Sequence, residues 1–268
     1  MSLIRPVLSS ALLAALCVTA LLLGAPANAA ARWQPKPTAA AWQWQLQGKI
    51  DTSVDADVYE VDGFEVGAKT VAKLHRQGRK VICYLDVGSW ENYRPDAGRF
   101  PKAVLGHAYE GYPDERWLDI RRIDLLAPIL RHRFDLCRRK GFDAVEPDNI
   151  AGYENKTGFP LSASDQLRFN RWVAREVHRR GMAIALKNDP GQVKQLLASF
   201  DFAVVEECFA YDECGKFSPF VEADKRVFVA EYSEPLAAIC DQAERLRFSV
   251  IRKDYDLFAR PWQPCQAE

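Results

Sequence analysis

Two short apolar runs of the sequence each end in carboxylates. One run extends from Ala144 to Asp148, and the other extends from Phe202 to Glu207. A charged side chain is costly inside a sheet, but at the carboxyl end of a strand it can face a cleft. Cleavage of a glycosidic bond needs two carboxyl groups, one to attack or to activate water and one to protonate the leaving oxygen. The two runs therefore predict a glycoside hydrolase.

Side chains alternate along a strand, and this alternation sorts the carboxylates of each run. Glu146 and Asp148 share a face, with Asp148 nearer the tip, so we expect Asp148 to be the nucleophile. Glu146 should lie one layer deeper, paired with a cation such as Lys187. In the second run, Glu206 and Glu207 face opposite ways. Both faces of that strand are apolar, so periodicity leaves open which of the two looks inward.

Strand-like and helix-like segments alternate along the chain, which predicts parallel strands joined by right-handed crossovers. Helical periodicity is clearest over 125–140, 162–180 and 235–245. Eight strands at this chain length favour an α/β fold of the single (β/α)8, or TIM-barrel, type. A doubly wound open sheet is the alternative, but no G-x-G-x-x-G fingerprint or P-loop supports it. The expected strands are 42–46, 58–61, 80–85, 144–147, 183–187, 202–206, 227–231 and 248–252.

A long, aromatic-rich insert interrupts the alternation after the third strand, between Asp86 and Asp124. Long loops at the carboxyl end of a barrel build its substrate site. The insert is therefore expected either to line that site or to form a rigid cap that packs its own aromatics. Its aromatic residues are Trp90, Tyr93, Phe100, Tyr109, Tyr112 and Trp117.

The first thirty residues have the pattern of a secretory signal peptide. Arg5 precedes an apolar stretch, and Ala27-Asn28-Ala29 offers a cleavage site. We expect a signal over 1–30, an extended lead-in over 31–41 and the catalytic domain over 42–268. An uncleaved anchor is the alternative, but the apolar stretch is short for a span and no stop-transfer segment follows. The protein is thus predicted to be secreted or periplasmic, with no stable membrane insertion after cleavage.

Loss of Cys17 with the signal leaves six cysteines of the original seven. An even number in an exported chain fits three disulfides, although spacing leaves their pairing open. Cys208 with Cys214 is favoured because it closes a short loop; Cys240 with Cys265 and Cys83 with Cys137 follow by elimination. The four histidines and these cysteines show no zinc-ligand spacing, so neither a metal site nor a cofactor is predicted.

The charges of the chain are balanced, with 36 basic and 36 acidic residues. Nothing in this balance points to nucleic acid as a partner. A local acidic cleft could still bind a cationic polymer. We expect the protein to act as a monomer.

Several motifs together resemble glycoside hydrolase family 114, the endo-α-1,4-polygalactosaminidases, which are TIM barrels. The resemblance runs through nearly the whole mature chain, and it implies that Asp148 is the nucleophile and Glu206, rather than Glu207, the acid/base. It also implies a galactosamine-rich polysaccharide as the substrate. The motifs are Trp42-Gln43-Trp44-Gln45-Leu46-Gln47-Gly48, Cys83-Tyr84, Glu146-Pro147-Asp148-Asn149 with Gly152-Tyr153, Lys187-Asn188, Glu206-Glu207-Cys208-Phe209 and Asp212-Glu213-Cys214.

A polymer of unacetylated galactosamine is cationic, so its cleft should hold further carboxylates and aromatic faces that stack on sugars. Asn149 should hydrogen-bond substrate or carboxylate, and Lys187 and Asn188 are expected among the substrate-binding residues. The acidic candidates are Asp62, Asp86, Glu91, Asp119 and Glu231, and the aromatic candidates are Trp44, Tyr84, Trp90, Tyr153 and Tyr232.

The function predicted on these grounds is endo-hydrolysis of α-1,4-galactosaminide linkages with retention. Retention predicts carboxyl groups about 5–5.5 Å apart, and about 6.5–9.5 Å would indicate inversion. A non-catalytic polysaccharide-binding barrel is the main alternative, because it needs aromatics and acids but no matched carboxylate pair. A metal-dependent deacetylase is a third hypothesis, which the histidine spacing disfavours.

Overall fold

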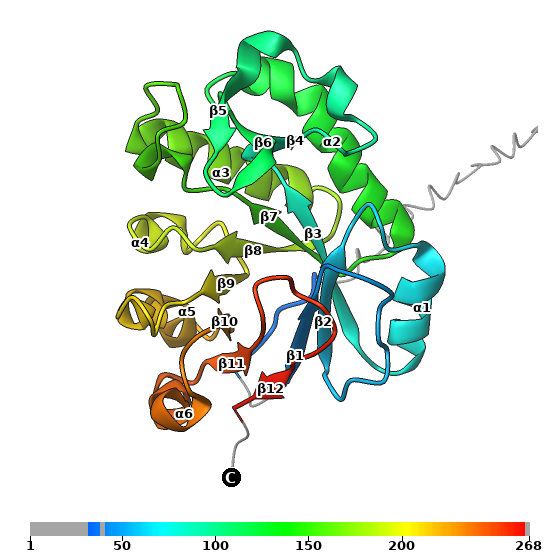
Figure 1. The fold of residues 1–268 in the computed structure, drawn as a ribbon, viewed down its shortest axis with the longest axis vertical. Helices are drawn as coiled ribbons and strands as arrows, with labels where there is room; N and C mark the ends of the chain where they lie inside the picture. Colours follow the sequence, from blue (N-terminus) through cyan, green and yellow to red (C-terminus); the bar gives the residue numbers. More distant parts are fainter. Residues whose placement is uncertain (1–31, 38–40, 266–268) are drawn as a thin grey trace, which may run out of the picture.

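The computed structural model describes residues 32–37 and 41–265, so the predicted signal over 1–30 lies outside the described residues. Eight parallel strands form a nearly closed barrel, and the helices lie around its outside (Figure 1). All eight predicted strands are present, and their bounds differ from the predicted ones by at most one residue. They are β1 (Trp42–Gln45), β2 (Val58–Asp62), β3 (Lys80–Asp86), β7 (Ala144–Asp148), β8 (Ala183–Lys187), β9 (Phe202–Glu206), β10 (Val227–Glu231) and β11 (Ser249–Arg252).

The order β1-β2-β3-β7-β8-β9-β10-β11 follows the chain, as expected of a TIM barrel rather than of a doubly wound sheet. The C-terminal segment completes the wall between β11 and β1. The short strand β12 (Gln263–Pro264) pairs antiparallel with β11. The indole nitrogen of Trp262 donates to the carbonyl of Trp42 (2.8 Å), and the backbone nitrogen of Leu46 donates to the carbonyl of Leu257 (3.0 Å).

Period-two alternation separates two apolar layers. Residues such as Trp42, Phe202 and Phe228 fill the barrel interior, and the alternate residues, such as Ala203 and Val205, pack outward against the helices. The helices are α1 (Ala68–Arg76), α2 (Ile123–Lys140), α3 (Ala163–His178), α4 (Val193–Leu196), α5 (Ser218–Glu222) and α6 (Leu236–Leu246).

Local sequence signals explain where the long helices begin and end. Ser162 caps α3 in a capping box with Asp165, which satisfies two backbone N–H groups that would otherwise lack partners. Gly141 ends α2 in the left-handed conformation, at φ +89°, which glycine adopts without steric cost. The lead-in packs against the barrel, where the ring of Trp33 lies 5.7 Å from the ring of Phe202.

The insert after β3 folds into a three-stranded antiparallel sheet with the order β4-β6-β5. Its strands are β4 (Ser89–Glu91), β5 (Leu105–Tyr109) and β6 (Tyr112–Leu118). Arg133 of α2, fully buried, fixes the insert to the barrel by donating to both carboxylate oxygens of Asp96 (2.9 and 2.8 Å) and to the carbonyl of Asp86 (2.7 Å). The antiparallel sheet therefore sits on a rigid support.

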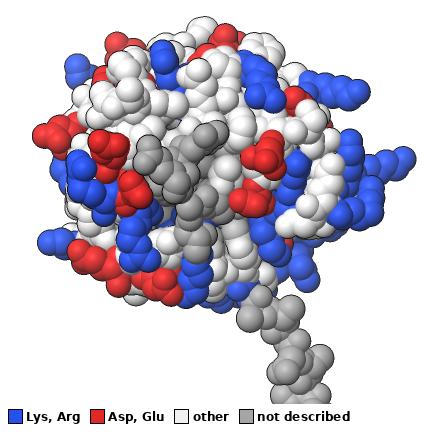
Figure 2. Space-filling view, turned by 90° about the horizontal axis from the view of Figure 1, so that it is seen from below, with Lys and Arg blue, Asp and Glu red and all other residues white. Residues whose placement is uncertain are grey.

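Three disulfides are present, and they join the pairs that the sequence analysis favoured. They are Cys83–Cys137, Cys208–Cys214 and Cys240–Cys265. On the face shown in Figure 2, basic and acidic side chains are interspersed, without a broad field of one sign. In the described part of the chain, no helix is both long enough and apolar enough to span a membrane.

Candidate active site

Asp148 closes β7 at the carboxyl end of the barrel, as predicted. Its Oδ2 accepts a hydrogen bond from the hydroxyl of Tyr84 (2.9 Å), and its Oδ1 accepts from the backbone nitrogen of Asn149 (2.8 Å) and from Nζ of Lys187 (3.0 Å). Burial alone would raise the pKa of Asp148, but the charge and hydrogen bond of Lys187 and these other donors together lower it below its usual value. Asp148 is therefore held ionised.

Glu206 closes β9 and looks into the barrel. Phe202 and Val204 belong to the interior layer, so the same face of the strand carries Glu206. The strand ends there, and Glu207 leaves it to accept a hydrogen bond from Tyr255 (2.7 Å). Asn188 orients Glu206 on two sides, because its Oδ1 accepts from the backbone nitrogen of Glu206 (2.9 Å) and its Nδ2 lies 3.5 Å from Oε2. Periodicity left open whether Glu206 or Glu207 faces the barrel interior, and the packing of β9 shows that it is Glu206.

Lys187, at the end of β8, binds three carboxylates at once. Its Nζ lies 2.9 Å from Oε1 of Glu146, 3.0 Å from Oδ1 of Asp148 and 3.0 Å from Oε2 of Glu206. Nζ also lies 4.9 Å from the centre of the Trp44 ring. Burial would lower the pKa of Lys187, but the three carboxylates outweigh it and raise the pKa well above its usual value. The lysine is a fixed positive charge at the floor of the site.

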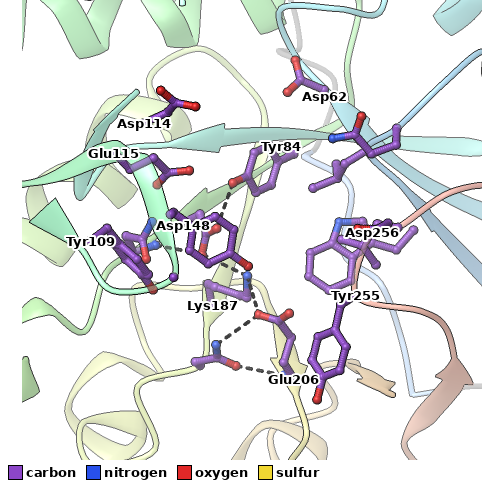
Figure 3. Close-up of a pocket in the computed structure, with 18 of the residues that line it drawn as sticks. Asp62, Tyr84, Tyr109, Asp114, Glu115, Asp148, Lys187, Glu206, Tyr255 and Asp256 are labelled. Carbon is purple, nitrogen blue, oxygen red and sulfur yellow. Dashed lines mark hydrogen bonds and ion pairs between the residues drawn. The ribbon is translucent and has the colours of Figure 1, made fainter. Parts of the chain in front are cut away.

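The shared lysine limits the separation of Asp148 and Glu206. Each contributes one oxygen 3.0 Å from the same nitrogen, so these two oxygens can be no further apart than twice that distance. Figure 3 shows both side chains converging on Lys187. The residues come from β7 and β9, two strands separated by the one that carries the lysine.

A second pair of carboxylates lies below the first. Glu60 of β2 and Glu146 of β7 are fully buried. Burial and the charge of Glu146 raise the pKa of Glu60 well above its usual value, which favours the neutral form of Glu60 beside Glu146. Glu60 was not among the predicted site residues, although an acidic residue inside the apolar run of β2 was an available signal.

The geometry agrees with comparisons to known proteins. The family model described as glycoside-hydrolase family GH114 matches residues 23–268. The chain belongs to family GH114. It is a glycoside hydrolase of the polygalactosaminidase type, as its resemblance to that family implied.

Solved structures place this GH114 enzyme in the same fold. It is similar to a crystal structure of Aspergillus fumigatus Ega3 in complex with galactosamine, with 37% identity, a TM-score of 0.81 and coverage of 85% of this chain and 96% of that one. The glycoside hydrolase domain of PelA from Pseudomonas aeruginosa shares the fold at 12% identity, with a TM-score of 0.65 and coverage of 86% of this chain and 99% of that one. A search of curated proteins gives no match.

Around the two carboxylates of the GH114 enzyme lies a cavity of about 850 Å³. Most of the predicted substrate-binding residues line it, namely Trp44, Asp62, Tyr84, Asn149, Lys187, Asn188 and Tyr232. The cavity is also lined by residues that were not predicted, namely Asp114 and Glu115 from the insert and Tyr255 and Asp256 from the C-terminal segment. These residues form opposite walls of the cavity (Figure 3).

The aromatic residues of the insert divide between the two expected roles. Tyr93, Tyr109, Tyr112 and Trp117 line the cavity. Trp90 instead donates its indole N–H to the carbonyl of Ala97 within the insert (3.0 Å), and Phe100 belongs to the core. The insert is therefore both a wall of the site and a self-packed cap.

Four of the predicted substrate-binding residues do not line the cavity. Each of them instead makes hydrogen bonds or ion pairs within the protein. Asp86 is buried and accepts from the backbone nitrogen of Gly88 (3.0 Å), and it also accepts from the side-chain amide of Asn149. Glu91, also buried, pairs with Arg94 (2.7 Å).

The other two predicted binding residues, Tyr153 and Glu231, make hydrogen bonds to residues of nearby loops. The hydroxyl of Tyr153 lies 3.3 Å from Oδ1 of Asp189, and the buried Glu231 accepts from the backbone nitrogen of Phe209 (2.9 Å). Asp119, a further acidic candidate, pairs with Arg121 (2.7 Å). A carboxylate after a strand can turn toward loop amides or arginines rather than toward the cleft, and sequence position does not distinguish these orientations.

Among the residues that the structure describes, one group has ligand atoms close enough to hold a metal ion. Atoms of Cys208, Cys214 and Glu231 lie within 4.8 Å of one another. The two sulfurs are joined in a disulfide, so they cannot act as thiolate ligands.

Proposed function

We propose that this GH114 enzyme is an exported, monomeric endo-hydrolase that cleaves α-1,4-galactosaminide linkages in a cationic polysaccharide, with retention of anomeric configuration. The proposal rests on one observation. Asp148 and Glu206 both form ion pairs with Nζ of Lys187, at the floor of an open cavity. This arrangement holds two carboxyl groups close together, as glycoside hydrolysis requires.

In the first step, Asp148 attacks the anomeric carbon while Glu206, protonated, gives its proton to the leaving oxygen. In the second step, Glu206 takes a proton from water, which attacks the same carbon and releases Asp148. Ionisation of Asp148 fits the nucleophile, because its lowered pKa keeps it charged. The hydroxyl of Tyr232 donates to Oε1 of Glu206 and Lys187 contacts Oε2, which fixes the orientation of the acid.

The separation of the carboxylates favours retention over inversion. Twice the 3.0 Å from each oxygen to Nζ of Lys187 is the largest possible distance between the two bound oxygens. That limit is shorter than the roughly 6.5 Å at which the inverting range begins. This limit supports the closer spacing of a retaining pair over the wider spacing that leaves room for a water beneath the sugar.

The charge of the cavity supports a cationic substrate. Its two basic residues are already paired, Arg94 with Asp62 and Glu91, and Lys187 with the catalytic carboxylates. An unpaired excess of acid therefore faces the substrate, which favours protonated amines. The complex of the similar Ega3 with galactosamine supports the same sugar class. Apart from the catalytic pair, the acidic lining residues are Asp62, Glu65, Asp114, Glu115 and Asp256.

Export is supported by two independent features. The first thirty residues have the signal-peptide pattern, and three disulfides join the six cysteines that would remain after cleavage. We propose the periplasm or the medium as the site of action.

The direct test incubates the mature protein with an unacetylated α-1,4-galactosamine polymer and follows reducing ends. We expect new reducing ends from internal cleavage, and Asp241→Asn, an exposed change on α6, should cleave equally well. Proton NMR of the first products should show the α-anomer. Polymer that is bound but not cleaved would instead identify a binding barrel, and a β-anomer would refute retention.

A further inference from the structure

The C-terminal wall of the cavity carries an exposed aromatic side chain next to the catalytic acid. Tyr255 is 66% exposed, yet its ring stacks on Tyr232 with centroids 4.2 Å apart and planes 27° apart. The hydroxyl of Tyr232 in turn donates to Glu206. Tyr255 is thus held next to the acid/base by stacking, on the side of the cavity opposite the insert (Figure 3).

Glu207 is hydrogen-bonded to Tyr255 at the edge of this wall. Its backbone adopts the left-handed conformation, at φ +55°, which is uncommon for a residue other than glycine and turns the chain out of β9. The hydroxyl of Tyr255 donates to Oε1 of Glu207 (2.7 Å), so a carboxylate lies at the edge of the exposed ring. This hydrogen bond raises the pKa of Tyr255 to about 12, which keeps the phenol a donor near neutral pH.

We propose that Tyr255 and Glu207 form a binding subsite for a protonated amino-sugar unit on the leaving-group side of the bond that is cut. The inference rests on the proposed function and specifies one part of its cleft. Because Glu206 protonates the leaving oxygen, the wall that extends from Glu206 away from Asp148 faces the departing part of the polymer.

The chemistry of this wall matches one hexosamine unit. An exposed phenol ring offers a face for the apolar side of a pyranose and attracts cationic groups through its quadrupole. Oε2 of Glu207 takes no part in the bond to Tyr255, and it provides an acceptor for an ammonium group beside the ring. Asp256, exposed and also lining the cavity, adds negative charge to the same wall.

The test uses substrates that do or do not place a sugar in this subsite. The first set consists of α-1,4-galactosamine oligomers, unacetylated or fully N-acetylated. The second is a galactosaminide with an aryl leaving group, in which no sugar follows the cleaved bond. Wild type is compared with Tyr255→Ala, with Glu207→Gln and with Phe258→Ala, an exposed aromatic of the same segment outside the cavity lining.

We expect Tyr255→Ala to lower kcat/KM on unacetylated oligomers about ten-fold, mainly through KM, and to leave the aryl substrate unchanged. Glu207→Gln should weaken cleavage of unacetylated oligomers about three-fold and not affect acetylated ones. Phe258→Ala should match wild type. Melting temperatures are recorded to show that every variant folds.

Two results would overturn the inference. One is equal oligomer cleavage by Tyr255→Ala and wild type. The other is an equal loss on the aryl substrate, which would mean that Tyr255 acts only by supporting Tyr232 and Glu206. Absence of galactosaminide cleavage by the wild type would instead refute the proposed function, so the two failures are distinguishable.

Discussion

Two layers of carboxylates meet at one lysine, and they differ in their access to water. In the upper layer, the side chains of Asp148 and Glu206 are 20% and 28% exposed; in the lower layer, Glu60 and Glu146 are fully buried. Along β7, a step of two residues separates Glu146 from Asp148. Burial raises the pKa of both carboxyl groups of the lower pair, because charges there cannot be hydrated, whereas the upper pair faces a cleft in which protons can be exchanged. In the proposed mechanism, depth in the barrel rather than residue type separates the supporting carboxylates from the reacting ones.

The largest effect should follow removal of either upper carboxylate. Asp148→Asn and Glu206→Gln should each lower kcat on the polymer by about 10³-fold or more, because each removes a reacting group. Stability should change little, since both side chains are partly exposed. Reducing-end assays and thermal unfolding measure the two quantities. Substantial activity in either variant would refute its assigned role.

Lys187→Met should affect both layers at once. Removal of the cation leaves three carboxylates close together with no counter-charge, and breaking a buried ion pair in this way costs roughly 3–5 kcal/mol. We expect a loss of that size in the free energy of unfolding, measured with urea, together with loss of turnover. Lys194→Met, on α4 outside the cavity lining, is the matched control. A fully stable Lys187→Met would show that the lysine does not hold the layers together.

The protonation of the lower pair predicts how stability depends on pH. Glu60 has a folded-state pKa raised above its unfolded value, so the unfolded chain loses this proton first, and the contribution of Glu60 to stability falls as pH rises above about 4.3. Glu60→Gln retains a neutral donor to Glu146 and removes this titration. Relative to wild type, the variant should gain stability between pH 4 and pH 7 in urea unfolding. A difference that does not change with pH would show that Glu60 is ionised in the folded protein.

The smallest effect concerns the insert wall. Burial raises the pKa of Glu115 to about 7, so its negative charge develops across the neutral range. Glu115→Gln should therefore weaken cleavage of unacetylated oligomers about three-fold at pH 8 and much less at pH 6, measured as kcat/KM relative to wild type at each pH. An equal ratio at both values would mean that Glu115 does not contact the amines.

The fold could be predicted from the sequence because each strand is a short apolar run and each long helix has a clear periodicity. The expectation of Asp148 at a strand tip, with Glu146 one layer below and paired with Lys187, rested on simple alternation and matches the geometry. The strands and helices, and the positions of Glu146 and Asp148 along their strand, depend on local backbone geometry. The sequence of one segment is enough to predict such geometry.

What could not be predicted depends on contacts between distant segments. Tyr255 reaches the site only because the C-terminal segment closes the barrel against β1. Glu115 does so because the insert folds into a sheet of its own. Conversely, Asp86 has the sequence position of a cleft carboxylate, but it accepts hydrogen bonds from the loop that follows it. The orientations of these three side chains cannot be predicted from the periodicity of the sequence.

The nucleophilic role of Asp148 is tested most directly by trapping its intermediate. Glu206→Gln is mixed with a galactosaminide whose aryl leaving group needs no protonation, and the protein is analysed by intact-mass and peptide mass spectrometry. Attack can then proceed, but without a base the intermediate is hydrolysed slowly. We predict one added galactosaminyl residue on the peptide that contains Asp148. An adduct on another residue, or turnover to an inverted product without any adduct, would contradict the account.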